Sequence, residues 1–314
     1  MTTTLSTTAW KAFLGLRCAV FLTPWLLHLF FADLILSSLL LPSWLLPDLC
    51  NRASSAIAES VWRGIQLIFT RINRADIILS GVEKLPPDES AIVISNHVEW
   101  TDFYMIQALA LRSGMLGKCR WFAKQQLKWV PFLGWGLWAM GMPLVSRNWT
   151  RDQREMDRVF HGPLKRQWPI WLIAYSEATR YTPAKRLEAE RWCHENGRRL
   201  GQHTLYPRTK GFIASAQKLR DAKQIKAVYD VTVAYARRRG DGFEFLQAPT
   251  FTESIMIPRL GQKWKFYAHV ERHPLEDVPT GEAELTQWLE ARWVEKGERL
   301  EALRQRLLKG LEWD

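Results

Sequence analysis

The sequence is sparing in cysteine and lacks the short motifs of several common functional sites. Its four cysteines, Cys18, Cys50, Cys119 and Cys193, are scattered and show no CxxC spacing. This pattern is typical of free thiols in a reducing compartment, and it argues against a disulfide framework or a metal cluster. A glycine-rich phosphate loop, an HExxH zinc motif, internal repeats and low-complexity tracts are also absent. We therefore expect no metal site.

The charge balance and the tryptophan content indicate what kind of partner the chain binds. The 43 Lys and Arg against 32 Asp and Glu give a net charge of +11, which favours nucleic acid, an acidic membrane face or a phosphorylated substrate. The chain also has 17 tryptophans, and Trp is enriched at membrane interfaces, where an apolar ring lies beside water. Because no nucleic-acid recognition motif is present, the membrane bilayer is the expected partner, with no nucleic acid.

The first 75 residues have the composition of a membrane attachment. From Phe13 to Leu46 the sequence is mostly apolar, which suffices for one tilted pass or a re-entrant hairpin but not for two full passes. Residues 51–75 place arginines among apolar positions, as an amphipathic helix on a lipid surface does. A cleaved secretory signal and a hairpin buried in a protein core are the alternatives. We expect residues 1–75 to be a membrane anchor and an amphipathic connector.

Residues 76–314 alternate between strand and helix patterns. Apolar or alternating runs predict strands at 91–95, 120–123, 143–145, 169–177, 226–235 and 263–271, and helical patterns lie near 101–111, 151–166, 185–199, after 207 and at 282–311. The alternation predicts an α/β domain with a central mixed, largely parallel sheet flanked by helices and a C-terminal helix, and with its site at the strand ends. The charge-free stretch 129–146 contains prolines and glycines, so we expect buried core or an interfacial segment there rather than a second span.

His97 and Asp102 form a candidate pair for chemistry. They lie in the segment NHVEWTD, residues 96–102, directly after an apolar strand. On one continuous helix, residues five apart point about 140° apart, so Asp102 contacts His97 only if the histidine lies in a turn before the helix. Asp102 would then hold one imidazole tautomer while the other ring nitrogen removes a proton from a substrate hydroxyl. The alternative is that Asp102 merely caps the helix.

Two further motifs place polar groups at strand ends. GMPLVSR, residues 141–147, ends in Arg147, and YSEATR, residues 175–180, carries Glu177 and Arg180. An arginine can bind phosphate through two parallel hydrogen bonds, and Glu177 is suited to hold an arginine or accept a substrate hydroxyl. Each motif alone also fits a solvated surface charge. Together with the His97–Asp102 pair they favour a single site for an anionic substrate.

The order of these motifs resembles NHxxxxD, GxxFVxR and FPEGTR of the glycerolipid acyltransferases similar to 1-acylglycerol-3-phosphate acyltransferase. AKQQLKWVPFLGW resembles the lysine-bearing segment of that family, with Lys124 in the expected place. YPRTKGF at 206–212 and VYDVTVAY at 228–235 are similar to a eukaryotic subgroup that includes endoplasmic-reticulum enzymes and fungal relatives. The resemblance extends over residues 80–300.

The resemblance implies a membrane-bound acyltransferase that converts 1-acyl-sn-glycerol-3-phosphate, a lysophospholipid, to phosphatidic acid. His97 would be the general base and Asp102 would orient it, with support from Asn96 and Thr179. Acyl-CoA is implied as the co-substrate, and because its thioester is already activated, no cofactor is needed. The site would face the cytosol from the endoplasmic reticulum, where CoA thioesters are available. The lipid phosphate would be bound by Arg147, Glu177, Arg180, Lys124 and Lys210.

Three positions depart from the family pattern and leave the substrate open. Leu144 replaces the usual Phe, and Ser176 and Ala178 replace Pro and Gly of the third motif. Since Gly serves where φ is positive or where backbone approaches a ligand, Ala178 is expected to resist the first and crowd the second. Remodelling of another lysophospholipid, such as lysophosphatidylinositol, is therefore an alternative. A non-catalytic membrane-binding relative and a lipid hydrolase are two others, although the hydrolase motif GxSxG is absent.

Overall fold

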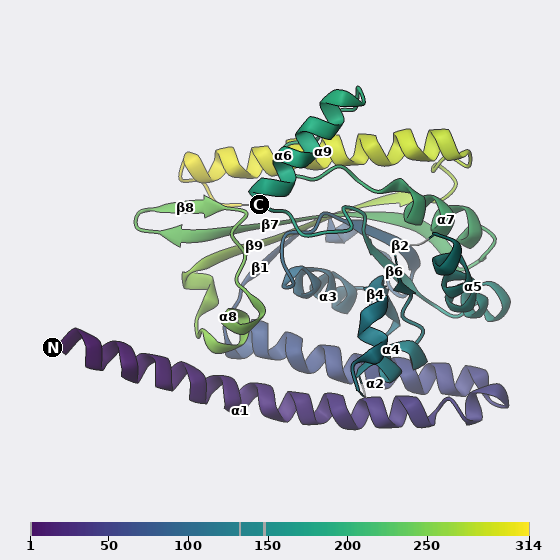
Figure 1. Ribbon diagram of the computed structural model, residues 1–314, viewed down its shortest axis with the longest axis horizontal. Coiled ribbons are helices and arrows are strands. Elements are labelled where there is room, and N and C mark those ends of the chain that lie inside the picture. Colours follow the sequence, from purple (N-terminus) through teal and green to yellow (C-terminus); the bar gives the residue numbers. More distant parts are fainter. Residues whose placement is uncertain (1, 132, 147–148, 314) are drawn as a thin grey trace.

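The computed structural model shows an α/β domain with two long helices beneath it (Figure 1). It describes residues 2–131, 133–146 and 149–313. The strands are β1 Ile77–Ser80, β2 Ser90–Ser95, β3 Cys119–Trp121, β4 Ala123–Lys124, β5 Leu144–Val145, β6 Trp171–Tyr175, β7 Ile225–Arg239, β8 Gly242–Phe245 and β9 Trp264–Pro274. The helices are α1 Thr2–Ser38, α2 Pro47–Leu67, α3 Asp102–Arg112, α4 Leu133–Ala139, α5 Trp149–Arg166, α6 Pro183–Glu195, α7 Thr209–Leu219, α8 Phe251–Met256 and α9 Glu282–Leu308.

A seven-stranded mixed sheet forms the centre of the domain. Its order is β1-β9-β7-β2-β6-β3, with β8 beside β7. β2 runs parallel to both β6 and β7, β3 parallel to β6, and β1 parallel to β9. β8 and β9 run antiparallel to β7, and β4 and β5 form a separate parallel pair. The predicted α/β class, with a mixed and largely parallel sheet flanked by helices, is therefore confirmed.

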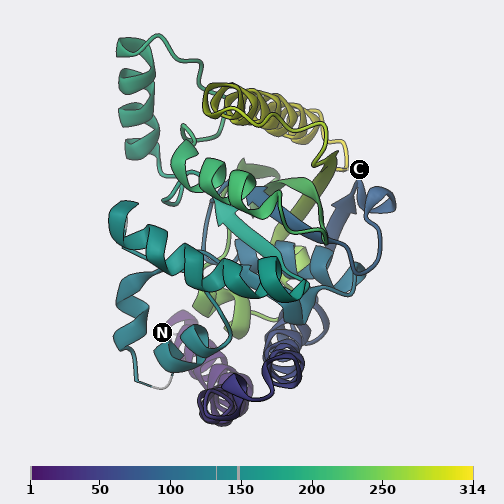
Figure 2. The same ribbon diagram turned by 90° about the vertical axis from the view of Figure 1, so that its right-hand side faces the viewer.

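The two faces of the sheet are covered by different helices (Figures 1 and 2). Successive side chains of a strand point to opposite faces, and β2 follows this rule. Ile92 and Ile94 pack with side chains of α5, α7 and α9, whereas Val93 packs with side chains of α2 and α3 such as Ile65 and Tyr104. Burial on both faces explains why β2 and β6 read as continuous apolar runs.

The N-terminal helix α1 has the length and composition to cross a membrane. Among the described residues it is the one such helix: the stretch Thr8–Ser38 has 31 residues, and its most apolar 18 residues have a mean hydropathy of 1.9 and are only 17% buried. It lies along α2 (Figures 1 and 2), and the indole nitrogen of Trp25 donates to the carbonyl of Val61 at 2.9 Å. The exposed apolar surface supports membrane association, while the hydrogen bond fixes α1 to the domain.

The helix α2 accounts for most of the amphipathic stretch 51–75, but its apolar side faces protein. Ser54, Ala58, Val61 and Ile65 are buried, and α2 contacts both α1 and α3. An amphipathic pattern shows which face of a helix is apolar without showing whether lipid or protein covers it. The expectation that this segment lies along lipid therefore applies only to its remaining exposed side chains, such as Leu67 and Ile72.

The apolar stretch 129–146 does not form a long helix. It contains α4, which has seven residues and is too short to span a bilayer. α4 packs against α1, and Trp129 and Trp135 nearby are exposed. The segment therefore has the exposed tryptophans expected of an interfacial element.

Candidate active site

The carboxyl ends of β2 and β6 bring the first and third motifs together. The two strands are parallel neighbours, with Ser95 opposite Tyr175, so Asn96-His97 and Ser176-Glu177 leave the sheet side by side. The chain from His97 to Thr101 forms a turn, and α3 begins at Asp102. The histidine therefore lies in the turn and the aspartate at the start of the helix, which is the arrangement that contact between them requires.

His97 and Asp102 are in direct contact. His97 Nδ1 and Asp102 Oδ2 are 2.7 Å apart, and Asp102 is fully buried. The same carboxylate accepts hydrogen bonds from the backbone N–H of Val98 at 2.6 Å and of Glu99 at 3.2 Å. Because an ionised carboxylate only accepts, Nδ1 carries the proton and Nε2 is left as the basic nitrogen. Asp102 thus caps the turn and orients the imidazole at once.

A tyrosine completes the surroundings of Asp102. Tyr235 on β7 donates its hydroxyl to Asp102 Oδ1 at 2.7 Å. Burial, together with the charge of Asp102, raises the pKa of Tyr235 well above its ordinary value. The phenol therefore stays protonated and remains a donor to the carboxylate.

The imidazole and its turn are held from two other sides. The ring of His97 stacks on that of Tyr175, with centroids 4.2 Å apart and planes at 15°. The buried Asn96 side chain exchanges two hydrogen bonds with the backbone of Val233, at 2.9 and 3.0 Å, and so extends the pairing of β2 with β7. Asn96 therefore has a supporting position beneath His97, as its place in the motif suggested.

Glu177 approaches the turn at His97 from the protein interior rather than from the solvent. Its carboxylate is buried and accepts from the indole nitrogen of Trp293 at 3.1 Å and from the backbone N–H of His97 at 3.4 Å. Burial raises the pKa of Glu177 to about 8, against smaller lowering effects from these donors. This geometry favours a role in holding the turn at His97, and a direct contact between Glu177 and a lipid phosphate stays a prediction.

The described cationic residues of the predicted phosphate site lie at the surface around this end of the sheet. Arg180 pairs with Glu99 of the first motif, and Thr179 accepts a hydrogen bond from Lys185. The exposed side chains of Lys124, at the end of β4, and Lys210, in the first turn of α7, face solvent. Arg147 lies outside the described residues. Their contacts with a ligand stay predictions.

The two replaced positions of the third motif have visible consequences. Ala178 adopts a φ of +55°, the left-handed conformation that glycine favours and alanine resists. The Ser176 hydroxyl is buried and has no hydrogen-bond partner among the described residues. The backbone carbonyl of Ser176 accepts a hydrogen bond from the backbone N–H of Arg208 at 2.6 Å. This bond brings the YPRTKGF segment to the end of β6.

Sequence reasoning missed Tyr175, Tyr235, Trp293 and Lys185. Tyr235 falls on the same face of β7 as Tyr229, Val231 and Val233, all in one core cluster. The strand alternation of VYDVTVAY therefore indicated its face but not its partner. Trp293 lies on α9, far along the chain, and no local motif connects it with Glu177.

Comparison with known proteins agrees with the motif order. A family model described as "Acyltransferase" matches residues 76–236, and another described as "Acyltransferase C-terminus" matches residues 260–306. The first model covers β1 and most of β7, and it includes His97, Asp102, Glu177 and Tyr235. The geometry above thus falls within the region that defines the family.

Several curated proteins are similar in sequence. The probable 1-acyl-sn-glycerol-3-phosphate acyltransferase 5 of Arabidopsis thaliana is 29% identical over 222 residues, which covers 71% of this chain and 55% of that protein. Lysocardiolipin acyltransferase 1 of Gallus gallus is 28% identical, covering 72% of this chain and 57% of that protein. The chain thus spans about half the length of these relatives. A solved 1-acyl-sn-glycerophosphate acyltransferase from Thermotoga maritima gives a TM-score of 0.49 at 16% identity, covering 95% of this chain and 99% of that one.

Proposed function

Since the chain belongs to the glycerolipid acyltransferase family, we propose that it transfers an acyl group from acyl-CoA to the free hydroxyl of a lysophospholipid. The relatives named for 1-acyl-sn-glycerol-3-phosphate support that compound as the acceptor and phosphatidic acid as the product. The relatives named for lysocardiolipin support a larger acceptor as the second candidate. Both acceptors carry a hydroxyl beside a phosphate, so the same chemistry serves either.

The observation that carries the proposal is the 2.7 Å contact between His97 Nδ1 and Asp102 Oδ2. With Nδ1 held, Nε2 takes the proton from the acceptor hydroxyl while its oxygen attacks the thioester carbonyl. The C–S bond then breaks, and the imidazolium returns the proton to the departing CoA sulfur. Asp102 stabilises the transient imidazolium, as a buried carboxylate beside a histidine does.

Phosphate binding is assigned to the cations around the strand ends. Arg180 leads this set, because an arginine can meet two phosphate oxygens at once, and its present partner Glu99 is a surface carboxylate that a phosphate could displace. Lys124, Lys210 and Arg147 are proposed to assist. The site is proposed to face the cytosol from the endoplasmic reticulum, supported by the apolar helix α1 and by where CoA thioesters occur.

An acceptor screen tests the proposal. The full chain in detergent or nanodiscs would receive acyl-CoA with lysophosphatidic acid, lysophosphatidylinositol or monolysocardiolipin, and the products would be identified by mass spectrometry. We expect a diacylated phospholipid from at least one acceptor, with lysophosphatidic acid as the best. Free fatty acid without an acylated acceptor would instead indicate a hydrolase. Persistent liposome binding with no transfer to any acceptor would indicate a non-catalytic relative.

A further inference from the structure

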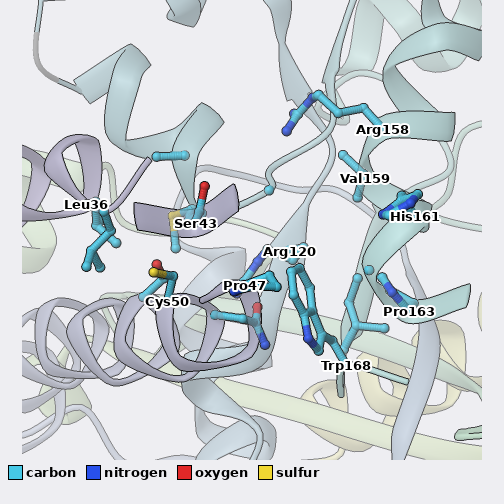
Figure 3. A pocket seen from close by; sticks show the side chains of 18 of the residues that line it. Leu36, Ser43, Pro47, Cys50, Arg120, Arg158, Val159, His161, Pro163 and Trp168 are labelled. Carbon is cyan, nitrogen blue, oxygen red and sulfur yellow. The ribbon is translucent and has the colours of Figure 1, made fainter. Parts of the chain in front are cut away.

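A cavity of about 190 Å³ lies beside the amino-terminal end of β6, whereas His97 lies beyond the carboxyl ends of β2 and β6. Figure 3 shows the side chains that line it. Ile170, which lines it, precedes β6, whereas the third motif follows the end of that strand. β6 has five residues, and a strand advances about 3.3 Å per residue, so the two places are about 15 Å apart. No described residue of 96–102 or 175–180 lines the cavity, and of the second motif only its first residue, Gly141, does so. It is therefore separate from the candidate active site.

One wall of the cavity is apolar and continuous with the exposed surface of α1. Leu36, Leu39 and Leu40 come from the end of this helix and the turn after it. Leu40 is partly exposed, and Leu41 beside it is 78% exposed. A lipid chain lying against the end of α1 would meet this wall.

The other wall carries a buried arginine that has no acidic partner among the described residues. Arg120 is only 6% exposed and lies in the cavity wall between Pro47 and Trp168 (Figure 3). Its hydrogen bonds go to neutral groups: Nη1 donates to the carbonyls of Gly117 and Cys119, both at 2.9 Å. Burial lowers the pKa of Arg120 to about 10, and no carboxylate of the residues that the structure describes pairs with its guanidinium.

A second arginine of the cavity provides the contrast. Arg158 also lines it but pairs with Glu155 at 2.6 Å and lies over the ring of Trp138 at 4.9 Å. Its charge is thus already balanced. Burying an unpaired charge is costly, and an incoming anion removes much of that cost. Arg120 is therefore the group in this cavity that favours an anionic ligand.

We propose that this cavity binds the phosphate of an anionic membrane phospholipid that is not a substrate. Arg120 pairs with the phosphate, and the first methylene groups of the acyl chain lie along Leu36, Leu39 and Leu40. The apolar wall favours a lipid over free phosphate, because inorganic phosphate would leave that wall uncovered. A lipid held here would fix the junction of α1, α2 and α4 to the membrane.

The test measures retained lipid on the full chain. The protein would be reconstituted in phosphatidylcholine nanodiscs containing phosphatidylglycerol, and lipids that remain after gentle release would be counted by native mass spectrometry. We expect one retained phosphatidylglycerol, and ten- to hundredfold weaker retention in Arg120→Gln, roughly the effect of losing a charged hydrogen bond. Arg239→Gln, at the exposed tip of the β7–β8 hairpin, is the matched control and should retain it.

A second pair of variants tests the cavity without touching Arg120. Leu40→Trp fills the apolar wall and should release the lipid, whereas Leu41→Trp, which lies outside the cavity, should not. Equal retention in the wild type, Arg120→Gln and Leu40→Trp would overturn the proposal. Complete displacement of the lipid by millimolar inorganic phosphate would also overturn it, in favour of a free-phosphate site. His97→Ala should retain the lipid, so this outcome does not depend on catalysis.

Discussion

At the scale of single residues, Asp102 has two functions that cannot be separated by changing it. Its oxygens orient His97 and also accept from the backbone of the turn that positions His97. Removing the carboxylate would therefore leave His97 without its orienting partner and would also destabilise the turn that holds it. Tyr235 offers a cleaner probe, because its hydroxyl donates to Asp102 Oδ1 and its removal leaves the bonds from Asp102 to His97 and to the turn in place.

We predict that Tyr235→Phe lowers kcat about tenfold and leaves KM unchanged. A hydrogen bond to a charged group contributes about 1.5–3 kcal/mol of stabilisation. Only the part of that stabilisation that is present in the transition state and absent from the ground state changes kcat. With one donor fewer, Asp102 attracts the imidazole proton more strongly, so the acidic limb of the pH–rate profile should move to higher pH. Steady-state kinetics between pH 5 and 9 would measure both effects.

Tyr229→Phe is the matched control for this prediction. Tyr229 lies on the same face of the same strand and donates to Glu89 at 2.5 Å, away from His97. It should reduce stability without moving the pH profile. An unchanged profile in Tyr235→Phe, or an equal shift in Tyr229→Phe, would show that Tyr235 acts only as core packing.

At the scale of elements, the turn from β6 to α6 carries strain at Ala178. We predict that Ala178→Gly stabilises the protein by up to about 1 kcal/mol, because a left-handed conformation costs an L-residue about 1–2 kcal/mol, partly offset by the greater freedom of glycine when unfolded. Denaturant unfolding in detergent would measure it. Ala189→Gly in the interior of α6 should instead destabilise by about 1 kcal/mol. If both variants changed the free energy of unfolding in the same direction, the proposed strain at Ala178 would be contradicted.

The elements show how far the sequence alone can go. Alternation and apolar runs predicted β2, β6, β7 and α3 with small errors at their ends, since period and breakers are local properties. The predicted turn between His97 and Asp102 is present because spacing and capping are local as well. The bond from Tyr235 to Asp102 joins residues 133 apart. Periodicity assigns a residue to a face of a strand, and only the fold determines what lies opposite.

The N-terminal helices show a second limit. An apolar face is favourable against lipid and against protein for the same reason, which is removal of apolar surface from water. Composition therefore indicated the anchor but not that α2 would bury Ala58, Val61 and Ile65 inside the domain. The sequence does not show that protein covers α2 while α1 stays exposed, because this depends on how the two helices pack against the rest of the fold.

At the scale of the whole molecule, several of the exposed tryptophans lie on or beside the N-terminal helices. Trp44 lies in the turn between α1 and α2. Trp129 precedes α4 and Trp135 lies within it, and α4 packs on α1. Their rings suit the boundary between headgroups and hydrocarbon. With a net charge of +11, the molecule is suited to an anionic bilayer surface, where the proposed lysophospholipid and its product both reside.

The most direct test of the account is the rate of acyl transfer by His97→Ala. General-base catalysis contributes about 10²–10⁴ to a rate, so we predict a loss of that size in kcat with little change in the KM for acyl-CoA. His194→Ala, an exposed histidine on α6, should keep the wild-type rate. Wild-type transfer by His97→Ala would contradict the claim that this imidazole, held by Asp102, removes the acceptor proton.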